Sequence, residues 1–262
     1  MFSKKAITIM NFSNVYNVEN MIQMNQKFKV HYLDMTKLSG TNCYCDEDAY
    51  NAIREKIDDT MLPGIHFIDS GNYHYLTRIW EDLVKVPFQL IVFDHHTDMQ
   101  LPAFGGILSC GGWIADSIES LDNLQRVILL GPPEQDYEQV EKCFQEKTYY
   151  RSENEMMFWG DAAEEILDKN LPIYISIDKD ILCTKDAQTN WSQGELELSD
   201  LLNQLRSIIS FAKKNEQPVL AIDICGECSA EDRKYQDLNE KANQKLTDLL
   251  TDLLHEEFYC EI

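Results

Sequence analysis

The stretch Leu90-Ile-Val-Phe-Asp94-His95-His96-Thr97-Asp98-Met99 decides the fold that this sequence predicts. Four apolar residues open it and favour a short buried strand. Asp94, His96 and Asp98 follow at alternate positions, and alternate side chains of an extended segment point the same way. Two carboxylates and an imidazole at such close range favour a bound cation. Their mixture of oxygen and nitrogen suits manganese, zinc or iron better than calcium. On its own, the stretch is equally compatible with a solvated acidic loop.

A second stretch, Ile173-Tyr-Ile-Ser-Ile177-Asp178-Lys179-Asp180, repeats the pattern of a buried strand that ends in carboxylates. A third apolar run, residues 219–222, precedes Asp223. The chemistry of an open parallel sheet is usually found beyond the carboxyl ends of its strands. We therefore expect Asp94, Asp178 and Asp223 at the carboxyl ends of neighbouring strands. The first two stretches carry more acid than one cation needs, which favours two metal ions.

Strand-like and helix-like segments alternate along the whole chain. The predicted strands are residues 6–10, 27–33, 65–68, 90–93, 126–130, 148–151, 173–178 and 219–222, and the predicted helices are residues 46–57, 73–84, 113–118, 154–167, 198–213 and 240–254. This alternation predicts an α/β fold of three layers, α-β-α, with a mainly parallel sheet covered on both faces. No repeat or linker divides the sequence, so we expect residues 1–262 to form a single domain.

The composition limits the class of partner. Lysine and arginine number 23 against 45 aspartate and glutamate residues, a net charge of −22, which argues against nucleic acid or an anionic membrane and favours a cationic substrate. Eight cysteines without a signal peptide predict reduced thiols and a cytoplasmic location. No apolar run approaches the roughly 18 residues of a membrane span. Cys225 and Cys228 form a CxxC that lacks a second pair, so a zinc ribbon is disfavoured.

In its motifs the chain resembles the arginase and agmatinase group, the ureohydrolases, which hydrolyse guanidino compounds with two manganese ions. Gly71-Asn72-Tyr73-His74-Tyr75 stands where the family has Gly-Gly-Asp-His-Ser. Asp94-His95-His96-Thr97-Asp98 stands for Asp-Ala-His-x-Asp, and Ser176-Ile177-Asp178-Lys179-Asp180 for Ser-x-Asp-x-Asp. Asp223-Ile224-Cys225-Gly226-Glu227 loosely resembles a later Asp-x-x-Glu. The resemblance implies the arginase-like fold.

The resemblance also implies a ligand set and a reaction. One manganese ion would be held by His74, Asp94, Asp98 and Asp178, and the other by Asp94, His96, Asp178 and Asp180. A hydroxide bridging the two metals, oriented by Asp98, would attack the guanidinium carbon of arginine, agmatine or an arginine-containing peptide. The products would be urea and an amine. Glu227 would pair with the guanidinium and so take part in substrate binding and catalysis.

The chain departs from the family pattern at three places. Cys110-Gly111 stands where the family usually has His-Gly, so Cys110 becomes a candidate substrate-binding residue in place of a proton-shuttling histidine. The Asp-Pro that normally follows the second acidic pair is replaced by Cys183-Thr184, and the final acid is displaced by one residue, to Glu227. Two alternatives therefore stay open. One is a metallohydrolase of the same fold acting on another C–N bond (formimino, amidine or acyl-amine), and the other is a non-catalytic metal-binding protein. The sequence is also compatible with a homo-oligomer.

Overall fold

The central sheet is parallel throughout. A computed structural model describes residues 6–24, 28–102, 106–156 and 159–254. Its eight-stranded sheet has the order β2-β1-β4-β10-β9-β5-β7-β8, and every pair of neighbours runs parallel, as predicted. The strands are β1 (Ala6–Asn11), β2 (Lys29–Asp34), β4 (Gly64–Phe67), β5 (Phe88–Phe93), β7 (Leu124–Gly131), β8 (Thr148–Ser152), β9 (Ile173–Asp178) and β10 (Val219–Cys225). A separate antiparallel pair joins β3 (Tyr44–Cys45) to β6 (Leu108–Ser109).

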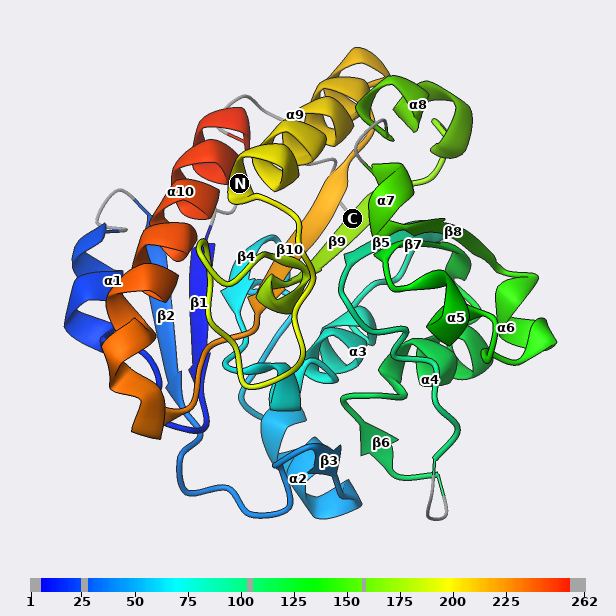
Figure 1. Cartoon of the computed structure of the whole chain (residues 1–262). Coiled ribbons are helices and arrows are strands. Elements are labelled where there is room, and N and C mark those ends of the chain that lie inside the picture. The colour runs from blue at the N-terminus through cyan, green and yellow to red at the C-terminus, as the bar shows by residue number, and fades with distance from the viewer. Residues whose placement is uncertain (1–5, 25–27, 103–105, 157–158, 255–262) are drawn as a thin grey trace.

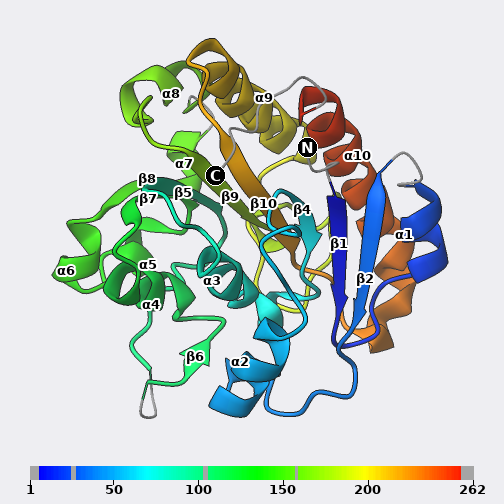
Figure 2. The same ribbon diagram turned by 180° about the vertical axis from the view of Figure 1, so that it is seen from behind.

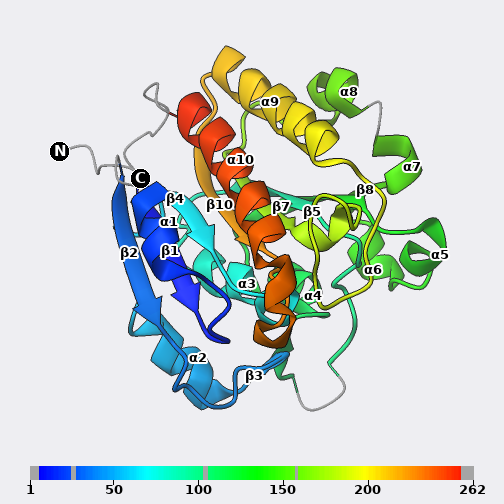
Figure 3. The ribbon, with the colours of Figure 1, turned by 60° about the vertical axis from the view of Figure 1, so that its left-hand side comes forward.

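Helices cover both faces of this sheet and complete the predicted three-layer fold. One face packs against α1 (Val18–Met24), α8 (Trp159–Ile166), α9 (Leu198–Lys214) and α10 (Gln236–Leu254), as Figures 1 and 3 show. The other face packs against α2 (Glu47–Arg54), α3 (Leu76–Glu81) and α4 (Trp113–Ser120), seen from behind in Figure 2. Three short helices, α5 (Glu134–Tyr137), α6 (Lys142–Gln145) and α7 (Glu153–Met156), lie near the β8 edge. None of the described helices is long and apolar enough to cross a membrane.

Several element boundaries differ from those predicted. The helix expected over residues 154–167 is two helices, α7 and α8, and residues 157–158 between them lie outside the described part of the chain, as does residue 27 of the second predicted strand. The helix expected over residues 73–84 is shorter, because a 3-10 turn, η1 (Gly71–Tyr73), precedes α3. That turn places His74 at the carboxyl ends of the central strands, where the acidic residues lie.

The three strands at the centre of the sheet place the expected acids as neighbours, with one correction. β10, β9 and β5 are adjacent, which confirms the predicted proximity of their carboxyl ends. The prediction that Asp223 ends its strand is wrong. β10 continues to Cys225, because Ile224 and Cys225 still pair with β9. Asp223 therefore lies two residues before the end of β10. Its carboxylate contacts His66 Nδ1 at 2.6 Å and accepts a hydrogen bond from the Tyr174 hydroxyl.

A fully buried carboxyl group on α3 makes stability depend on pH. Ser117 Oγ donates to Glu81 Oε2 at 2.5 Å, whereas Glu81 Oε1 has no hydrogen-bond partner. Burial raises the pKa of Glu81 from 4.5 to about 8. The folded state therefore binds a proton that the unfolded state has released between about pH 4.5 and 8. This group's contribution to stability is fully present below the unfolded pKa and is lost as the pH rises through the folded pKa.

Glu81→Gln should abolish that pH dependence. The amide keeps the shape of the neutral carboxyl group and cannot ionise, so we expect the melting temperature at pH 8 to exceed that of the wild type by about 5 °C or more. At pH 5 the two proteins should melt within about 2 °C of each other. Glu119→Gln, at an exposed site on α4, is the matched control and should change neither value. Equal melting temperatures for Glu81→Gln and the wild type at pH 8 would contradict the assignment.

Candidate metal centre

The loop after β5 bends instead of continuing as a strand. Asp94 Oδ1 accepts the backbone N–H of His96 at 2.6 Å, which closes a local turn, and Asp98 has a positive φ of 48°. The assumption of extended geometry through Asp98 is therefore wrong. The three side chains still lie close together, but in two groups of possible ligands. Asp98 lies with His74, His96 lies with Asp180, and Asp94 belongs to both groups.

The first group forms around the His74 imidazole. His74 Nδ1 lies 3.0 Å from Asp94 Oδ2, 3.0 Å from Asp98 Oδ2 and 3.7 Å from Asp178 Oδ2. The other ring nitrogen, Nε2, is 2.9 Å from Ser176 Oγ, and donation there leaves Nδ1 with a lone pair that faces the carboxylates. Gly71 allows the segment before His74 to approach the site closely, because a Cβ at Gly71 would lie 2.8 Å from Trp191 Cδ1 and 3.0 Å from Asp178 Oδ2.

The second group shares Asp94 with the first. His96 Nδ1 lies 2.8 Å from Asp180 Oδ2 and 3.5 Å from Asp94 Oδ1, while His96 Nε2 is 2.9 Å from Ser192 Oγ. The remaining oxygen of Asp180 accepts the backbone N–H of His95 at 3.0 Å. Asp178 Oδ1 accepts the Asp180 backbone N–H at 2.9 Å and so links the groups through the β9 end. The structure thus brings all six predicted metal ligands together at one edge of the sheet.

The crowding of buried carboxylates and imidazoles shifts the pKa values of these side chains. Burial and the charge of Asp94 raise the pKa of Asp98 to about 6. Burial lowers the pKa of His96, but hydrogen bonds to Asp180 and Asp94 outweigh it and raise that pKa to about 12. Asp94 itself is also buried, yet its contacts with His74 and His96 lower its pKa. His96 therefore carries a proton that holds Asp94 and Asp180 together, and a divalent cation would displace this proton on binding.

The donor atoms fit a metal. His74 Nδ1 and Asp94 Oδ2 are buried side-chain atoms without a hydrogen-bond partner, which is uncommon for polar atoms in a protein interior. Both atoms face the same acidic group, at 3.0 Å from each other. A cation between them would satisfy both, and the mixture of carboxylate and imidazole suits Mn²⁺, Fe²⁺ or Zn²⁺.

Comparison with known proteins assigns the family. The family model described as the arginase family matches residues 7–250. The chain belongs to the arginase family. This arginase-family protein is also 30% identical, over 226 residues, to an uncharacterised protein of Thermotoga maritima, a match that covers 84% of this chain and 79% of the relative.

Solved structures of arginase-family enzymes share this fold. The agmatine ureohydrolase of Thermoplasma volcanium superposes with a TM-score of 0.71 at 13% identity, covering 97% of this chain and 90% of that chain. The formiminoglutamase of Trypanosoma cruzi, solved with Mn²⁺, gives a TM-score of 0.66 at 13% identity, covering 95% and 94%. At these identities the likeness establishes the arginase-like fold, which confirms the predicted fold class.

Glu227 does not have a free carboxylate at the metal centre. Its side chain is buried, and its Oε1 accepts hydrogen bonds from Lys179 Nζ and, at 2.8 Å, from Asn243 Nδ2. Lys179 lies between two predicted metal ligands in sequence and is itself fully buried. A guanidinium bound by Glu227 would therefore have to share the carboxylate with this ammonium group.

Cys110 borders the centre as a buried thiol. Its backbone N–H donates to the Cys43 carbonyl oxygen at 2.9 Å, beside the β3–β6 pair. Burial and the nearby charge of Asp98 raise the pKa of the Cys110 thiol. The thiol therefore stays protonated near neutral pH, so it can donate a hydrogen bond but does not replace a histidine that exchanges protons in that range.

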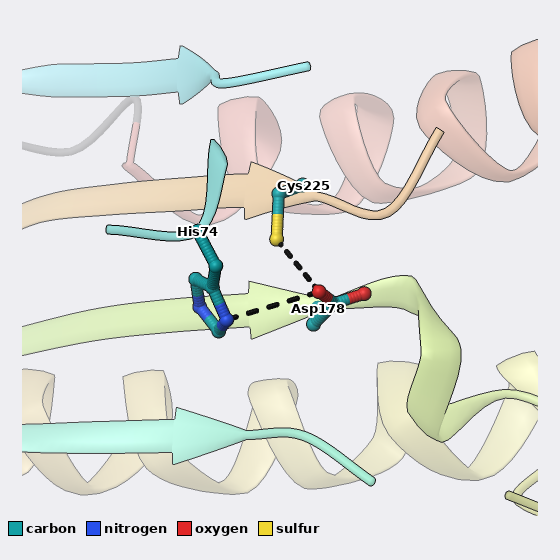
Figure 4. A group of neighbouring side chains, drawn as sticks. All are labelled: His74, Asp178 and Cys225. Atoms are coloured by element: carbon teal, nitrogen blue, oxygen red, sulfur yellow. Dashed lines mark hydrogen bonds and ion pairs between the residues drawn. The ribbon is translucent and has the colours of Figure 1, made fainter. Parts of the chain in front are cut away.

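Sequence reasoning missed several residues that contact the ligands, including Ser192 beside His96. Trp113 Nε1 donates to Asp98 Oδ2 at 2.7 Å, Ser176 Oγ contacts His74, and Cys225 Sγ lies 3.0 Å from Asp178 Oδ2 (Figure 4). The sequence did carry a signal for Ser176, since it alternates with Asp178 along β9 and therefore lies on the same face. Cys225 belonged to a CxxC and to the motif that loosely resembles Asp-x-x-Glu, and neither pattern assigned it a contact with the site. Cys228 makes a separate contact, with the Asp232 carbonyl.

Two features lie around the centre. The half-exposed Trp191 packs beside His96, with ring centroids 5.8 Å apart, and its Nε1 donates to Asn72 Oδ1 at 2.9 Å. A polar cavity of about 230 Å³ lies beyond the carboxyl ends of β1 and β10 and contains none of the six predicted metal ligands in its lining. It is lined by Asn14, Val15, Tyr16, Asn17, Cys228, Ser229 and Gln236.

Proposed function

We propose that this arginase-family protein is a hydrolase that uses two manganese ions to cleave a guanidino compound to urea and an amine. The observation that carries the proposal is the pair of carboxylate–histidine groups that share Asp94 at the carboxyl ends of the central strands. The proposed ligands are His74, Asp94, His96, Asp98, Asp178 and Asp180. The Mn²⁺ of the related formiminoglutamase supports the choice of metal.

Two cations bound there would act as Lewis acids and lower the pKa of water at the site. The remaining contributions come from the chain. Trp113 fixes the orientation of Asp98 by its hydrogen bond to Oδ2, and Ser176 fixes the His74 ring through Nε2. Asp98 is proposed to orient the attacking water and to accept its proton. Cys110 is proposed to contact the substrate as a neutral thiol.

The substrate is proposed to be a small cation. A net charge of −22 favours the approach of a guanidinium or amidinium group, whether in arginine, agmatine or an arginine-containing peptide. Glu227 remains the proposed guanidinium anchor from the family pattern, with Lys179 as its competitor for the carboxylate. The seven cysteines within the described residues are all unpaired, which supports the proposal of a reducing, cytoplasmic location. A homo-oligomer is compatible with this proposal.

A second candidate is hydrolysis of a formimino or related amidine bond. The ion pair between Glu227 and Lys179 favours it, because the carboxylate that the family pattern assigns to the guanidinium is already bound by an ammonium group. A formiminoglutamase is also among the structures that share the fold. This substrate would release formamide or ammonia in place of urea.

A screen for products separates these functions. Manganese-loaded protein should release urea from at least one compound in a panel of arginine, agmatine, other guanidino compounds and arginine-containing peptides. Formimino compounds assayed for formamide and ammonia form the second arm. Release of formamide without urea would replace the first function by the second. No product from either arm, with about two metal ions bound per chain, would leave a metal-binding protein without catalysis and overturn both.

A further inference from the structure

Cys225 places a sulfur atom against one metal-binding position. It is the last residue of β10, and its register partner on β9 is Asp178. Cys225 Sγ lies 3.0 Å from Asp178 Oδ2, and the cysteine is fully buried. Figure 4 shows the thiol and the His74 ring directed at the same carboxylate from two sides. Cys225 belongs to a hydrophobic core cluster, but its sulfur contacts a carboxylate, unlike that of a cysteine that acts only as a small hydrophobe.

An unsatisfied ligand atom points to a cation among these three side chains. One ligand atom from each of His74, Asp178 and Cys225 lies within 4.8 Å of the other two. His74 Nδ1 is 3.7 Å from Asp178 Oδ2 and is buried without a hydrogen-bond partner. Three donors at such distances can share one ion, since zinc bonds to sulfur are about 2.3 Å and to nitrogen or carboxylate oxygen about 2.0–2.2 Å.

The residue after Cys225 allows the ends of β10 and β9 to lie close together. Gly226 has a φ of 87°, a conformation that favours glycine. A Cβ at Gly226 would lie 2.4 Å from Asp178 Oδ1 and 2.7 Å from the Lys179 backbone nitrogen. Any other residue there would push Asp178 and the end of β10 apart, and with them the thiol. Gly226 therefore holds the sulfur and the carboxylate in contact.

We propose that Cys225 is a metal ligand, which gives the His74–Asp178 position a preference for a thiophilic divalent cation such as Zn²⁺ or Co²⁺ over Mn²⁺. The inference rests on the proposed two-metal site and changes the expected occupant of one position. The other position, Asp94, His96 and Asp180, offers only oxygen and nitrogen and keeps its preference for Mn²⁺. On metal binding the thiol loses its proton to solvent, and the thiolate forms the metal–sulfur bond.

Cobalt absorption tests the assignment without substrate. Titration of the full-length wild-type protein with Co²⁺ should produce a thiolate-to-cobalt charge-transfer band in the near ultraviolet that saturates at about one equivalent. Cys225→Ser should lose the band and still bind cobalt at the second position. Cys110→Ser and Cys228→Ser are matched controls, because each removes a nearby thiol, and both should retain the band.

Competition between metals tests the preference. Loss of the sulfur in Cys225→Ser should weaken Zn²⁺ binding by about tenfold or more, with Mn²⁺ binding changed by less than about threefold. Zinc-loaded wild-type protein should also show a metal–sulfur distance of about 2.3 Å in X-ray absorption. This measurement requires no variant and therefore decides the question even if Cys225→Ser fails to fold.

Three results would overturn the proposal. They are cobalt binding by the wild type without a charge-transfer band, a band that persists in Cys225→Ser, and zinc-loaded protein without sulfur scattering. In each case the thiol would only donate a hydrogen bond to Asp178. The outcome is independent of catalysis. If the band is present and no urea is released, Cys225 is a metal ligand and the proposed function is wrong. If urea is released and the band is absent, the proposed function holds and Cys225 is not a ligand.

Discussion

Asp94→Ala is expected to empty both metal positions at once. Asp94 is the carboxylate that both groups contain, with His74 on one side and His96 on the other. After manganese loading, metal analysis should fall from about two equivalents per chain to less than one. Turnover of any substrate found in the product screen should fall by about a thousandfold or more, which corresponds to about 4 kcal/mol of transition-state stabilisation.

Thermal unfolding gives a second measure of this loss. A cation that binds only the folded state raises its stability, so excess Mn²⁺ should raise the melting temperature of the wild type. The same addition should leave Asp94→Ala unchanged. Asp34→Ala is the matched control, because Asp34 also ends a parallel strand of this sheet, β2, but is exposed and outside both groups. Two equivalents of manganese in Asp94→Ala would refute the shared position of Asp94.

Most of the sheet could be predicted because the strands have a strong local signal. In β9 the apolar Ile173, Ile175 and Ile177 face the core under α9 and α10, and the alternate residues carry the polar groups to the other face. The acids beyond β5 and β9 then followed from parallel pairing alone. The two-residue strands β3 and β6 gave no comparable signal, because so short a pair has no periodicity to detect.

The conformation of the ligands could not be predicted in the same way. Whether residues 94–98 extend or turn depends on hydrogen bonds such as that from the His95 N–H to Asp180, 85 residues away in the sequence. The contact of Cys225 with Asp178 depends on the register between β10 and β9, which neither strand encodes alone. The partner of Glu227 is 48 residues distant. Local patterns identified the residue types at the site, and long-range pairing decided their contacts.

Glu227→Gln is expected to destabilise the fold as well as affect substrate use. The carboxylate compensates the ammonium of Lys179, which is fully buried, and Asn243 bonds to both groups. Removing one partner of a buried ion pair leaves an uncompensated charge and costs about 3–5 kcal/mol. We therefore expect the melting temperature to fall by about 10 °C. The same substitution in an exposed pair, Glu164→Gln beside Lys214, should change it by no more than about 3 °C.

The position of Lys179 extends this effect to the metal. Lys179 lies between Asp178 and Asp180 in the chain, so an unpaired ammonium there should also weaken binding of divalent cations. Loss of turnover in Glu227→Gln would then not identify a substrate anchor by itself. If Glu227→Gln melts at the wild-type temperature, the ion pair with Lys179 does not form in solution. Glu227 would then be free to bind the substrate.

A double substitution separates the two roles of Glu227. Lys179→Met together with Glu227→Leu removes both charges and keeps similar volume, a change that is often neutral or stabilising for buried pairs. This variant should recover part of the stability lost in Glu227→Gln, because the buried Asn243 still loses both of its partners. It should bind manganese as the wild type does. If it also hydrolyses the substrate at the wild-type rate, Glu227 serves only to hold Lys179 beside the metal ligands. If it is folded and metal-loaded but its turnover is lost, the carboxylate binds the guanidinium in spite of its bond to Lys179, and the anchor inferred from the family pattern is retained.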